Sequence, residues 1–296
     1  MRPSAVLTQC VRQPVRGSQP EMDAIEISLE WGHRGAKRAA ARGDVVVICD
    51  VLSFSTAVVI AVDRGATVFP CADEVEARVV SAKHGATIAV RREEAAERGG
   101  LSLSPASMLS CVQGERIALP SPNGAACCRL ATGAAGVIVG ALVNATEAAR
   151  AAAALAGRLR RGLAIIACGE RWTDAHADGA LRFALEDYLG AGAVLSALDR
   201  SVAPSGVACR EVASFAGDSQ PCAPLTPDAA VCRDAFRASA GRIEALLRDC
   251  PSGRVLRDRG WPQDVELAAE VDCCRAVPIL MDGAPVRAAT DSSPRT

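Results

Sequence analysis

The sequence is poor in the residues on which several functional classes depend. Aromatic side chains make up only 3% of its 296 residues, and Lys+Arg 33 against Asp+Glu 34 leave a net charge of -1. Such a chain offers neither stacking platforms for bases nor a basic surface, so we do not expect nucleic acid as a partner. Because there are only three histidines, a histidine-rich zinc site is not expected either.

The sequence also lacks the hydrophobic segments of a membrane or secreted protein. No run of about 18 uninterrupted apolar residues occurs, so a membrane span is not expected. Charged residues and prolines interrupt residues 1–20, so no signal peptide is recognisable. The 13 cysteines include no C-x-x-C spacing, and an odd number in a long chain is typical of reduced thiols. We therefore predict a cytoplasmic protein without disulfide bonds.

Short apolar runs recur along the chain, half of which is hydrophobic. Apolar and polar residues alternate over 25–30, which predicts an edge strand with one exposed face. Other runs show no alternation and are typical of strands buried on both faces. These runs are 45–51, 67–70, 86–90, 117–120, 137–140 and 163–168.

Helix-boundary signals separate most of these runs. Asp73 and Glu76 have the spacing of a capping box before a helix that ends at Gly85, and Asn144 and Glu147 have the same spacing. The alternation of strands and helices predicts an α/β fold, with a largely parallel sheet flanked by helices and a more helical second half. In that half we predict helices at 178–199, 227–250 and 264–271.

We expect one domain over residues 21–283, made of two closely packed halves. The first half covers about 21–162 and the second about 163–283. Residues 1–20 and 284–296 are rich in Pro, Ser, Arg and Thr without periodicity, so we interpret both as tails.

Residues that can bind an anion through a polar side chain or a backbone N–H follow three of the predicted strands at their carboxyl ends, where parallel sheets bind ligands. They are Asp50, Ser55, Thr56, Ser121, Asn123, Gly124, Glu170 and Arg171. Together they indicate an anion site beside carboxylates, and Mg²⁺ is the common ion between such groups. A structural interpretation stays open for each, because helix capping or a Glu170–Arg171 pair would also explain them.

Asp187 is a further acid of interest, because it interrupts the apolar stripe of the predicted helix 178–199. Burying an unpaired carboxylate is costly, so we expect Asp187 to meet a cation, a metal ion or strong donors. Its neighbour Glu186 lies four residues after Arg182, which predicts a surface ion pair instead.

Several short blocks occur in the order seen in the 2-phosphosulfolactate phosphatase family, which the chain resembles over about residues 22–283. The blocks are 47–56, 97–100, 121–124, 169–171, 185–193 and 277–283. The resemblance implies a magnesium-dependent phosphatase with its own α/β fold. In that family the reaction releases phosphate from 2-phospho-3-sulfolactate on the route to coenzyme M.

The resemblance implies a role for each candidate residue. Asp50, Glu170 and Asp187 are expected to be catalytic and to hold Mg²⁺. A small phosphorylated anionic hydroxy acid would be bound by Ser55, Thr56, Arg98, Ser121, Asn123, Gly124 and Arg171. The sequence leaves open whether Asp50 attacks phosphorus itself, and whether the chain forms a homodimer.

The sequence departs from the family pattern where a substrate anion would be recognised. Ser53-Phe54 stands in place of Arg-Ala, and Ser121-Pro122 in place of Thr-Thr. Position 53 therefore lacks a guanidinium suited to a sulfonate or phosphate. Two alternatives follow: a phosphatase for a different phosphorylated metabolite, or a non-catalytic anion-binding or metabolite-binding protein on the same fold.

Overall fold

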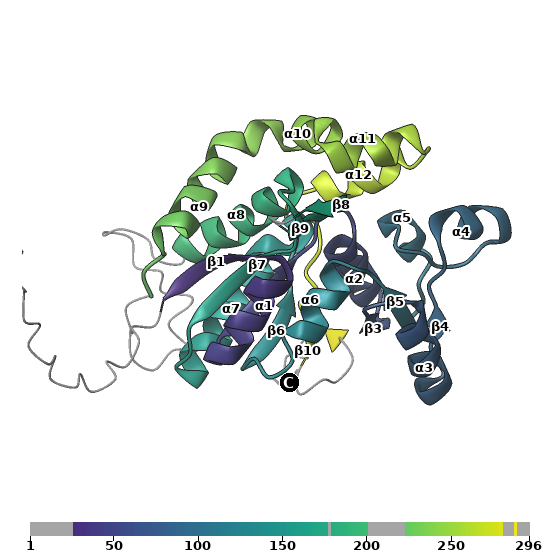
Figure 1. Ribbon diagram of the computed structural model, residues 1–296, viewed down its shortest axis with the longest axis horizontal. Helices are drawn as coiled ribbons and strands as arrows, with labels where there is room; N and C mark the ends of the chain where they lie inside the picture. The colour runs from purple at the N-terminus through teal and green to yellow at the C-terminus, as the bar shows by residue number, and fades with distance from the viewer. Residues whose placement is uncertain (1–25, 177–178, 201–222, 281–286, 289–296) are drawn as a thin grey trace, which may run out of the picture.

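The computed structural model describes residues 26–176, 179–200, 223–280 and 287–288 (Figure 1). The predicted tail 1–20 lies outside these residues, and so do residues 201–222 between two of the predicted helices; of the predicted tail 284–296, residues 287–288 are described and form a strand. The predicted extent of the domain and its division into two halves therefore stay predictions. None of the helices described here has the length and apolar character needed to cross a membrane.

A six-stranded sheet lies at the centre of the fold (Figure 1). Its order is β1 (Ile27–Trp31), β7 (Leu163–Ala167), β2 (Val45–Cys49), β6 (Gly136–Val139), β10 (Pro278–Leu280) and β11 (Arg287–Ala288). The first four strands are parallel, and β10 and β11 are antiparallel to their neighbours. This arrangement confirms the predicted fold class and places β1 at an edge, as its alternating pattern indicates.

Helices cover both faces of this sheet because its inner strands are apolar on both sides. Val45, Val47 and Cys49 of β2 pack with α7 (Ala145–Leu159), α8 (Leu185–Arg200) and α9 (Pro227–Ser239). Val46 and Ile48 pack on the opposite face with α1 (Gly32–Arg42), α2 (Phe54–Asp63) and α6 (Gly124–Leu130). The period of two along an extended strand thus supplies both hydrophobic layers.

A second, smaller parallel sheet contains the other predicted strands, in the order β3 (Thr67–Cys71), β5 (Arg116–Pro120) and β4 (Thr87–Ile88). Helix α3 (Glu74–His84) packs on one face, and α2 and α6 contact β3 from the other side. As predicted, Asp73 caps α3 by accepting from the N–H of Glu76, and the helix ends at Gly85. Helices α4 (Arg92–Arg98) and α5 (Pro105–Met108) connect β4 to β5.

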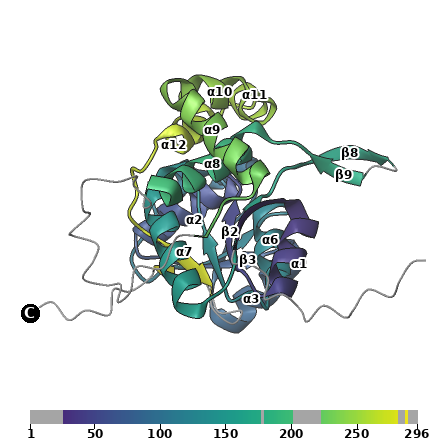
Figure 2. The ribbon, with the colours of Figure 1, turned by 90° about the vertical axis from the view of Figure 1, so that its left-hand side faces the viewer.

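The second half is mostly helical, but it begins with a hairpin that the sequence did not predict. Strands β8 (Glu170–His176) and β9 (Gly179–Arg182) pair antiparallel and project from the body of the protein (Figure 2). The helix predicted from residue 178 therefore starts only at Leu185. The remaining described elements are η1 (Leu142–Asn144), η2 (Ala240–Arg242), α10 (Ile243–Asp249), α11 (Pro251–Asp258) and α12 (Pro262–Ala269).

Candidate active site

Asp50 lies immediately after β2, at the point where loops from both sheets meet. Its side chain is buried, with 5% of the residue exposed. Its Oδ2 accepts a hydrogen bond of 2.7 Å from the N–H of Gly124, and its Oδ1 accepts one of 3.3 Å from the N–H of Phe54. One carboxylate therefore joins the end of β2 to the loop that follows β5.

The hydroxyls of Ser55 and Thr56 stabilise the loop that carries Asp50. Ser55 Oγ donates to the carbonyl of Ile48 and accepts from the N–H of Asp50, and Thr56 Oγ1 donates to the carbonyl of Val51. Both residues are completely buried. In this structure both hydroxyls are used by the backbone, and the expectation that these residues bind the substrate stays a prediction.

Asp187, in the first turn of α8, joins the loops that follow β2 and β7. Its Oδ1 accepts from the N–H of Val51 at 2.7 Å, and its Oδ2 accepts from the N–H of Gly169 at 2.8 Å. The residue is 3% exposed. The expectation that this buried acid meets strong donors is confirmed, and the donors are backbone N–H groups.

Glu170 begins β8 and faces the loop after β5. Its Oε2 accepts from Asn123 Nδ2 and from the N–H of Arg171, both at 3.2 Å. Ser121 is 2% exposed, and its Oγ is 3.4 Å from the backbone nitrogen of Asn123. The structure therefore brings Asn123, Gly124 and Glu170 together with Asp50.

His33 is a residue at the rim that sequence reasoning did not include in the site. Its Nδ1 lies 3.3 Å from Arg171 Nη1, and its Nε2 lies 3.0 Å from the carbonyl of Pro122. An imidazole protonated at Nε2 satisfies both contacts, because the arginine donates and the carbonyl accepts. His33 thus orients the exposed guanidinium of Arg171 at the edge of the site.

The acids are close enough to influence one another. Burial raises the pKa of Asp50 to about 7, and repulsion from Glu170 contributes in the same direction. Burial also raises the pKa of Asp187 well above its ordinary range, with further contributions from Asp50 and Glu186. Asp50 is therefore the acid that interacts with both of the others.

Glu186 does not form the predicted surface pair with Arg182. The hairpin delays the start of α8 to Leu185, and Glu186 in its first turn lies inside the protein with 1% of the residue exposed. Among the described residues, its Oε2 has no hydrogen-bond partner. Glu186 therefore adds a buried carboxyl group next to the site rather than a surface charge.

The acids only partly fit the expected metal centre. Within the described part of the chain, no three Asp, Glu, His or Cys side chains are grouped closely enough to hold a metal ion. Both Asp50 and Asp187 have a backbone donor on each oxygen, but the two bonds to Asp187 are short, at 2.7 and 2.8 Å, whereas the bond from Phe54 to Asp50 Oδ1 is 3.3 Å. The residues do fit an ion held by two carboxylates, those of Asp50 and Glu170. Mg²⁺ is often bound in this way, with water molecules and substrate phosphates as its remaining ligands.

Arg98 pairs within its own helix, and Arg92 at the other end of α4 is the arginine that contacts the loop after Asp50. The Arg98 side chain is 76% exposed and pairs with Glu94 on its own helix. Arg92 Nη2 instead donates to Ser53 Oγ at 2.7 Å. A tertiary contact between residues 39 positions apart leaves no local signal in the sequence, which explains why Arg92 was missed.

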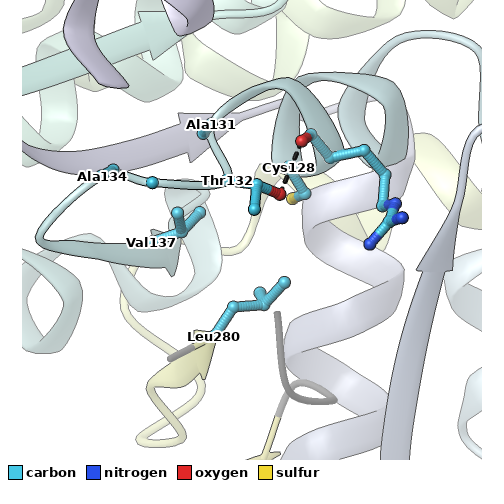
Figure 3. A pocket seen from close by; sticks show the side chains of 8 residues that line it. Cys128, Ala131, Thr132, Ala134, Val137 and Leu280 are labelled. Atoms are coloured by element: carbon cyan, nitrogen blue, oxygen red, sulfur yellow. Dashed lines mark hydrogen bonds between the residues drawn. The ribbon is translucent and has the colours of Figure 1, made fainter. Parts of the chain in front are cut away.

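A small hollow of about 20 Å³ lies beside the end of α6, between Cys128, Val137 and Leu280 (Figure 3). This volume is close to the minimum that one water molecule requires. It is therefore too small to bind a phosphorylated metabolite.

Gly124 approaches the Asp50 loop so closely that a side chain there is excluded. A Cβ atom would lie 2.3 Å from Phe54 Cδ1 and 2.7 Å from Asp50 Oδ2. We expect Gly124→Ala to lower the free energy of unfolding by about 1 to 3 kcal/mol because one of these neighbours must move. Urea denaturation measures this change.

Gly157→Ala provides the matched control, because nothing lies within 4 Å of a Cβ atom at that position in α7. Alanine is the better helix former, so this variant should be at least as stable as the wild type. Equal stability of the two alanine variants would contradict the close contact at Gly124.

Comparison with known proteins agrees with this arrangement. Residues 34–283 match the model of the family described as 2-phosphosulpholactate phosphatase. The chain is also 28% identical over 249 residues to a protein of Deinococcus radiodurans named "Probable 2-phosphosulfolactate phosphatase", covering 81% of this chain and 89% of that relative. The chain therefore belongs to the 2-phosphosulfolactate phosphatase family, a family of phosphoric monoester hydrolases.

Proposed function

We propose that this phosphatase depends on Mg²⁺ and hydrolyses the phosphate monoester of a small anionic hydroxy acid. The observation that carries the proposal is the buried Asp50 carboxyl beside Glu170, where loops from both sheets meet. Two neighbouring carboxylates repel each other when ionised, and a cation between them removes that repulsion. Phosphate esters supply the remaining oxygen ligands of such an ion.

Asp50 and Glu170 would hold the ion, which as a Lewis acid would neutralise charge on the phosphoryl oxygens. Asp187 would act through the loops, since its oxygens keep Val51 and Gly169 in place on either side of Asp50. It is a positioning residue in this proposal. The ionised form of Asp50 is the one that binds a cation, so metal binding would displace its proton.

Asn123 and Arg171 are the side chains best placed to bind the phosphoryl group. Asn123 Nδ2 already donates to Glu170, and the Arg171 guanidinium lies at the rim beside His33. Phosphoryl transfer relies mainly on positioning and charge neutralisation, and an amide and a guanidinium supply both. The name of the Deinococcus relative supports a substrate with a second acidic group, such as 2-phosphosulfolactate.

The test is Mg²⁺-dependent release of phosphate from 2-phosphosulfolactate and related phosphorylated hydroxy acids. We expect EDTA to stop the reaction and Mg²⁺ to restore it. Glu170→Gln removes one proposed ligand charge, so it should raise the Mg²⁺ concentration for half-maximal rate by at least about 10-fold. Calorimetric titration of Mg²⁺ into both proteins should show the same loss of affinity.

Glu266→Gln is the control, since Glu266 is exposed on α12. It should bind Mg²⁺ and release phosphate like the wild type. Phosphate release that is insensitive to EDTA, or Glu170→Gln with unchanged Mg²⁺ affinity, would refute the metal assignment.

A further inference from the structure

An open cavity of about 180 Å³ lies next to the loop that carries Asp50. It is formed by α4, α5 and the start of α12, elements that lie side by side at one end of the molecule (Figure 1). Arg92, Ala96, Ser102, Ser104, Ser107 and Trp261 line it. Drug-sized ligands usually occupy 300–1,000 Å³, so this cavity suits a small acidic group rather than a nucleotide.

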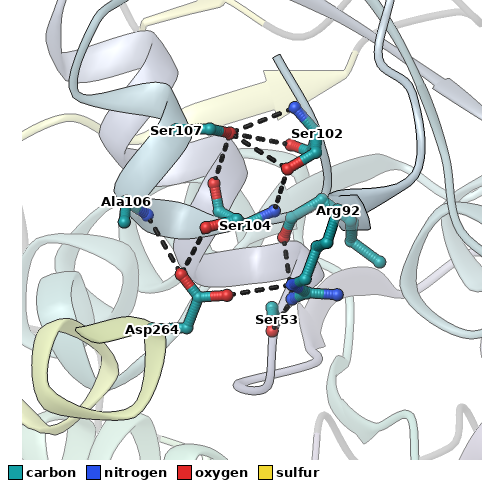
Figure 4. A network of polar contacts seen from close by, with 8 residues as sticks. Ser53, Arg92, Ser102, Ser104, Ala106, Ser107 and Asp264 are labelled. Carbon is teal, nitrogen blue, oxygen red and sulfur yellow. Dashed lines mark hydrogen bonds and ion pairs between the residues drawn. The ribbon is translucent and has the colours of Figure 1, made fainter. Parts of the chain in front are cut away.

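The Arg92 guanidinium is held rigidly at the wall of this cavity (Figure 4). Its Nε donates to Asp264 Oδ2 at 2.9 Å, and its Nη2 donates to Ser53 Oγ at 2.7 Å and to the carbonyl of Leu103 at 3.3 Å. The ring of Trp261 lies 5.6 Å from the guanidinium carbon. These contacts fix the plane of the guanidinium before any ligand arrives.

One nitrogen of Arg92 remains available to a ligand. Within the described residues, Nη1 has no hydrogen-bond acceptor, and the side chain is 15% exposed. Asp264 does not compete for it, because Ser104 Oγ and the N–H of Ala106 donate to Oδ1 while Oδ2 accepts from Nε. The ion pair therefore orients Arg92 and leaves two N–H groups for an anion.

The cavity and the acids are connected through one short segment. Arg92 contacts Ser53, which follows Asp50 by three residues. Three residues span at most about 11 Å of backbone, so the cavity and the Asp50 carboxyl adjoin the same short loop. Ser53 itself has no positive charge, and Arg92 supplies a guanidinium at this point of the loop.

We propose that the cavity at Arg92 is a subsite for the carboxylate or sulfonate group of the phosphorylated substrate. This inference rests on the proposed function and extends it, because it assigns a residue to the end of the substrate that does not react. Arg92 would discriminate in favour of esters with a second acidic group and would contribute little to an ester without one.

A pair of substrates tests this role. Phospholactate carries a carboxylate, and isopropyl phosphate has a methyl group in its place. We expect Arg92→Gln to lower kcat/KM for phospholactate by about 10- to 100-fold, the usual effect of losing a charged hydrogen bond. For isopropyl phosphate, kcat/KM should change less than about 2-fold. Arg158→Gln, the same substitution at an exposed position of α7, should change neither.

Arg92→Gln could also impair folding, because Arg92 pairs with the buried Asp264. A second pair of variants therefore tests the subsite without changing Arg92. Ala96 lines the cavity on the exposed side of α4 and takes no part in the Arg92 contacts. Ala96→Glu and Ala96→Gln add similar volume, but only the glutamate repels an acidic ligand. The glutamate variant should show at least about 10-fold lower kcat/KM for phospholactate than the glutamine variant.

Binding without turnover separates this inference from the proposed function. Calorimetric titration of phospholactate into the metal-free proteins should show binding that Arg92→Gln and Ala96→Glu weaken. Arg92-dependent binding without phosphate release from either ester would support the subsite and refute the proposed function. Equal effects of Arg92→Gln on both esters, or equal kcat/KM for the two Ala96 variants, would overturn the subsite.

Discussion

Asp50→Asn is expected to lower kcat for phosphate release by roughly 10³-fold, the effect of losing one group that stabilises charge in a transition state. Asp50 is the acid that interacts electrostatically with both Glu170 and Asp187. Asparagine keeps the shape of the side chain but removes the charge that would bind a cation. Single-turnover phosphate release at saturating Mg²⁺ measures the change without the contribution of product release.

Asp258→Asn is the matched control, because Asp258 is exposed at the end of α11. Its kcat should equal that of the wild type. Circular dichroism establishes that the Asp50 variant is folded, since its side chain also accepts two backbone hydrogen bonds. A folded Asp50→Asn protein with wild-type kcat would exclude Asp50 from the chemistry.

The metal-free protein is expected to lose stability as the pH rises. The folded state raises the pKa of Asp50 to about 7, so between pH 4 and 7 the folded chain binds more protons than the unfolded chain. The contribution is fully present below the unfolded pKa and is lost as the pH rises through the folded pKa. From pH 5 to pH 8, Asp50 alone should lower the free energy of unfolding by about 3 kcal/mol.

Urea denaturation in EDTA at the two pH values measures this loss. Between the two pH values, the free energy of unfolding of Asp50→Asn should fall by about 3 kcal/mol less than that of the wild type. The raised pKa of Asp187 accounts for part of the pH dependence that remains. Asparagine has one oxygen and therefore loses one of the two hydrogen bonds that Asp50 accepts. This loss lowers the free energy of unfolding equally at both pH values, so the change between them is unaffected. Equal pH slopes for Asp50→Asn and wild type would contradict a raised Asp50 pKa.

Features set by local chemistry could be predicted from the sequence. The apolar run before Asp50 forms β2, the Asp73–Glu76 spacing caps α3, and an acid in an apolar helical stripe is buried at position 187. Each signal depends on a few neighbouring residues. The meeting of Asp50 with Glu170 follows from a general rule, because β2 and β7 are parallel neighbours whose carboxyl ends lie at one edge.

Features set by distant pairing could not be predicted in this way. The same apolar runs could form either one sheet or two. No local pattern in the sequence shows that β3, β5 and β4 form a sheet of their own. Residues 179–182 form a strand because they pair with β8, so the start of α8 and the orientation of Glu186 were predicted incorrectly. The Arg92–Ser53 contact depends on how α4 packs against the β2–α2 loop.

The segment from Asp50 to Ser53 is fixed by contacts along its length, with Asp187 at Val51 and Arg92 at Ser53. In the proposed complex, the groups that bind the two ends of the substrate would therefore be linked through this one segment of backbone. Changes at Arg92 and at Asp187 should be energetically coupled, and their separate effects should not add. Evolution of a new specificity in this fold would then require simultaneous changes at the Arg92 and Asp187 ends of the segment.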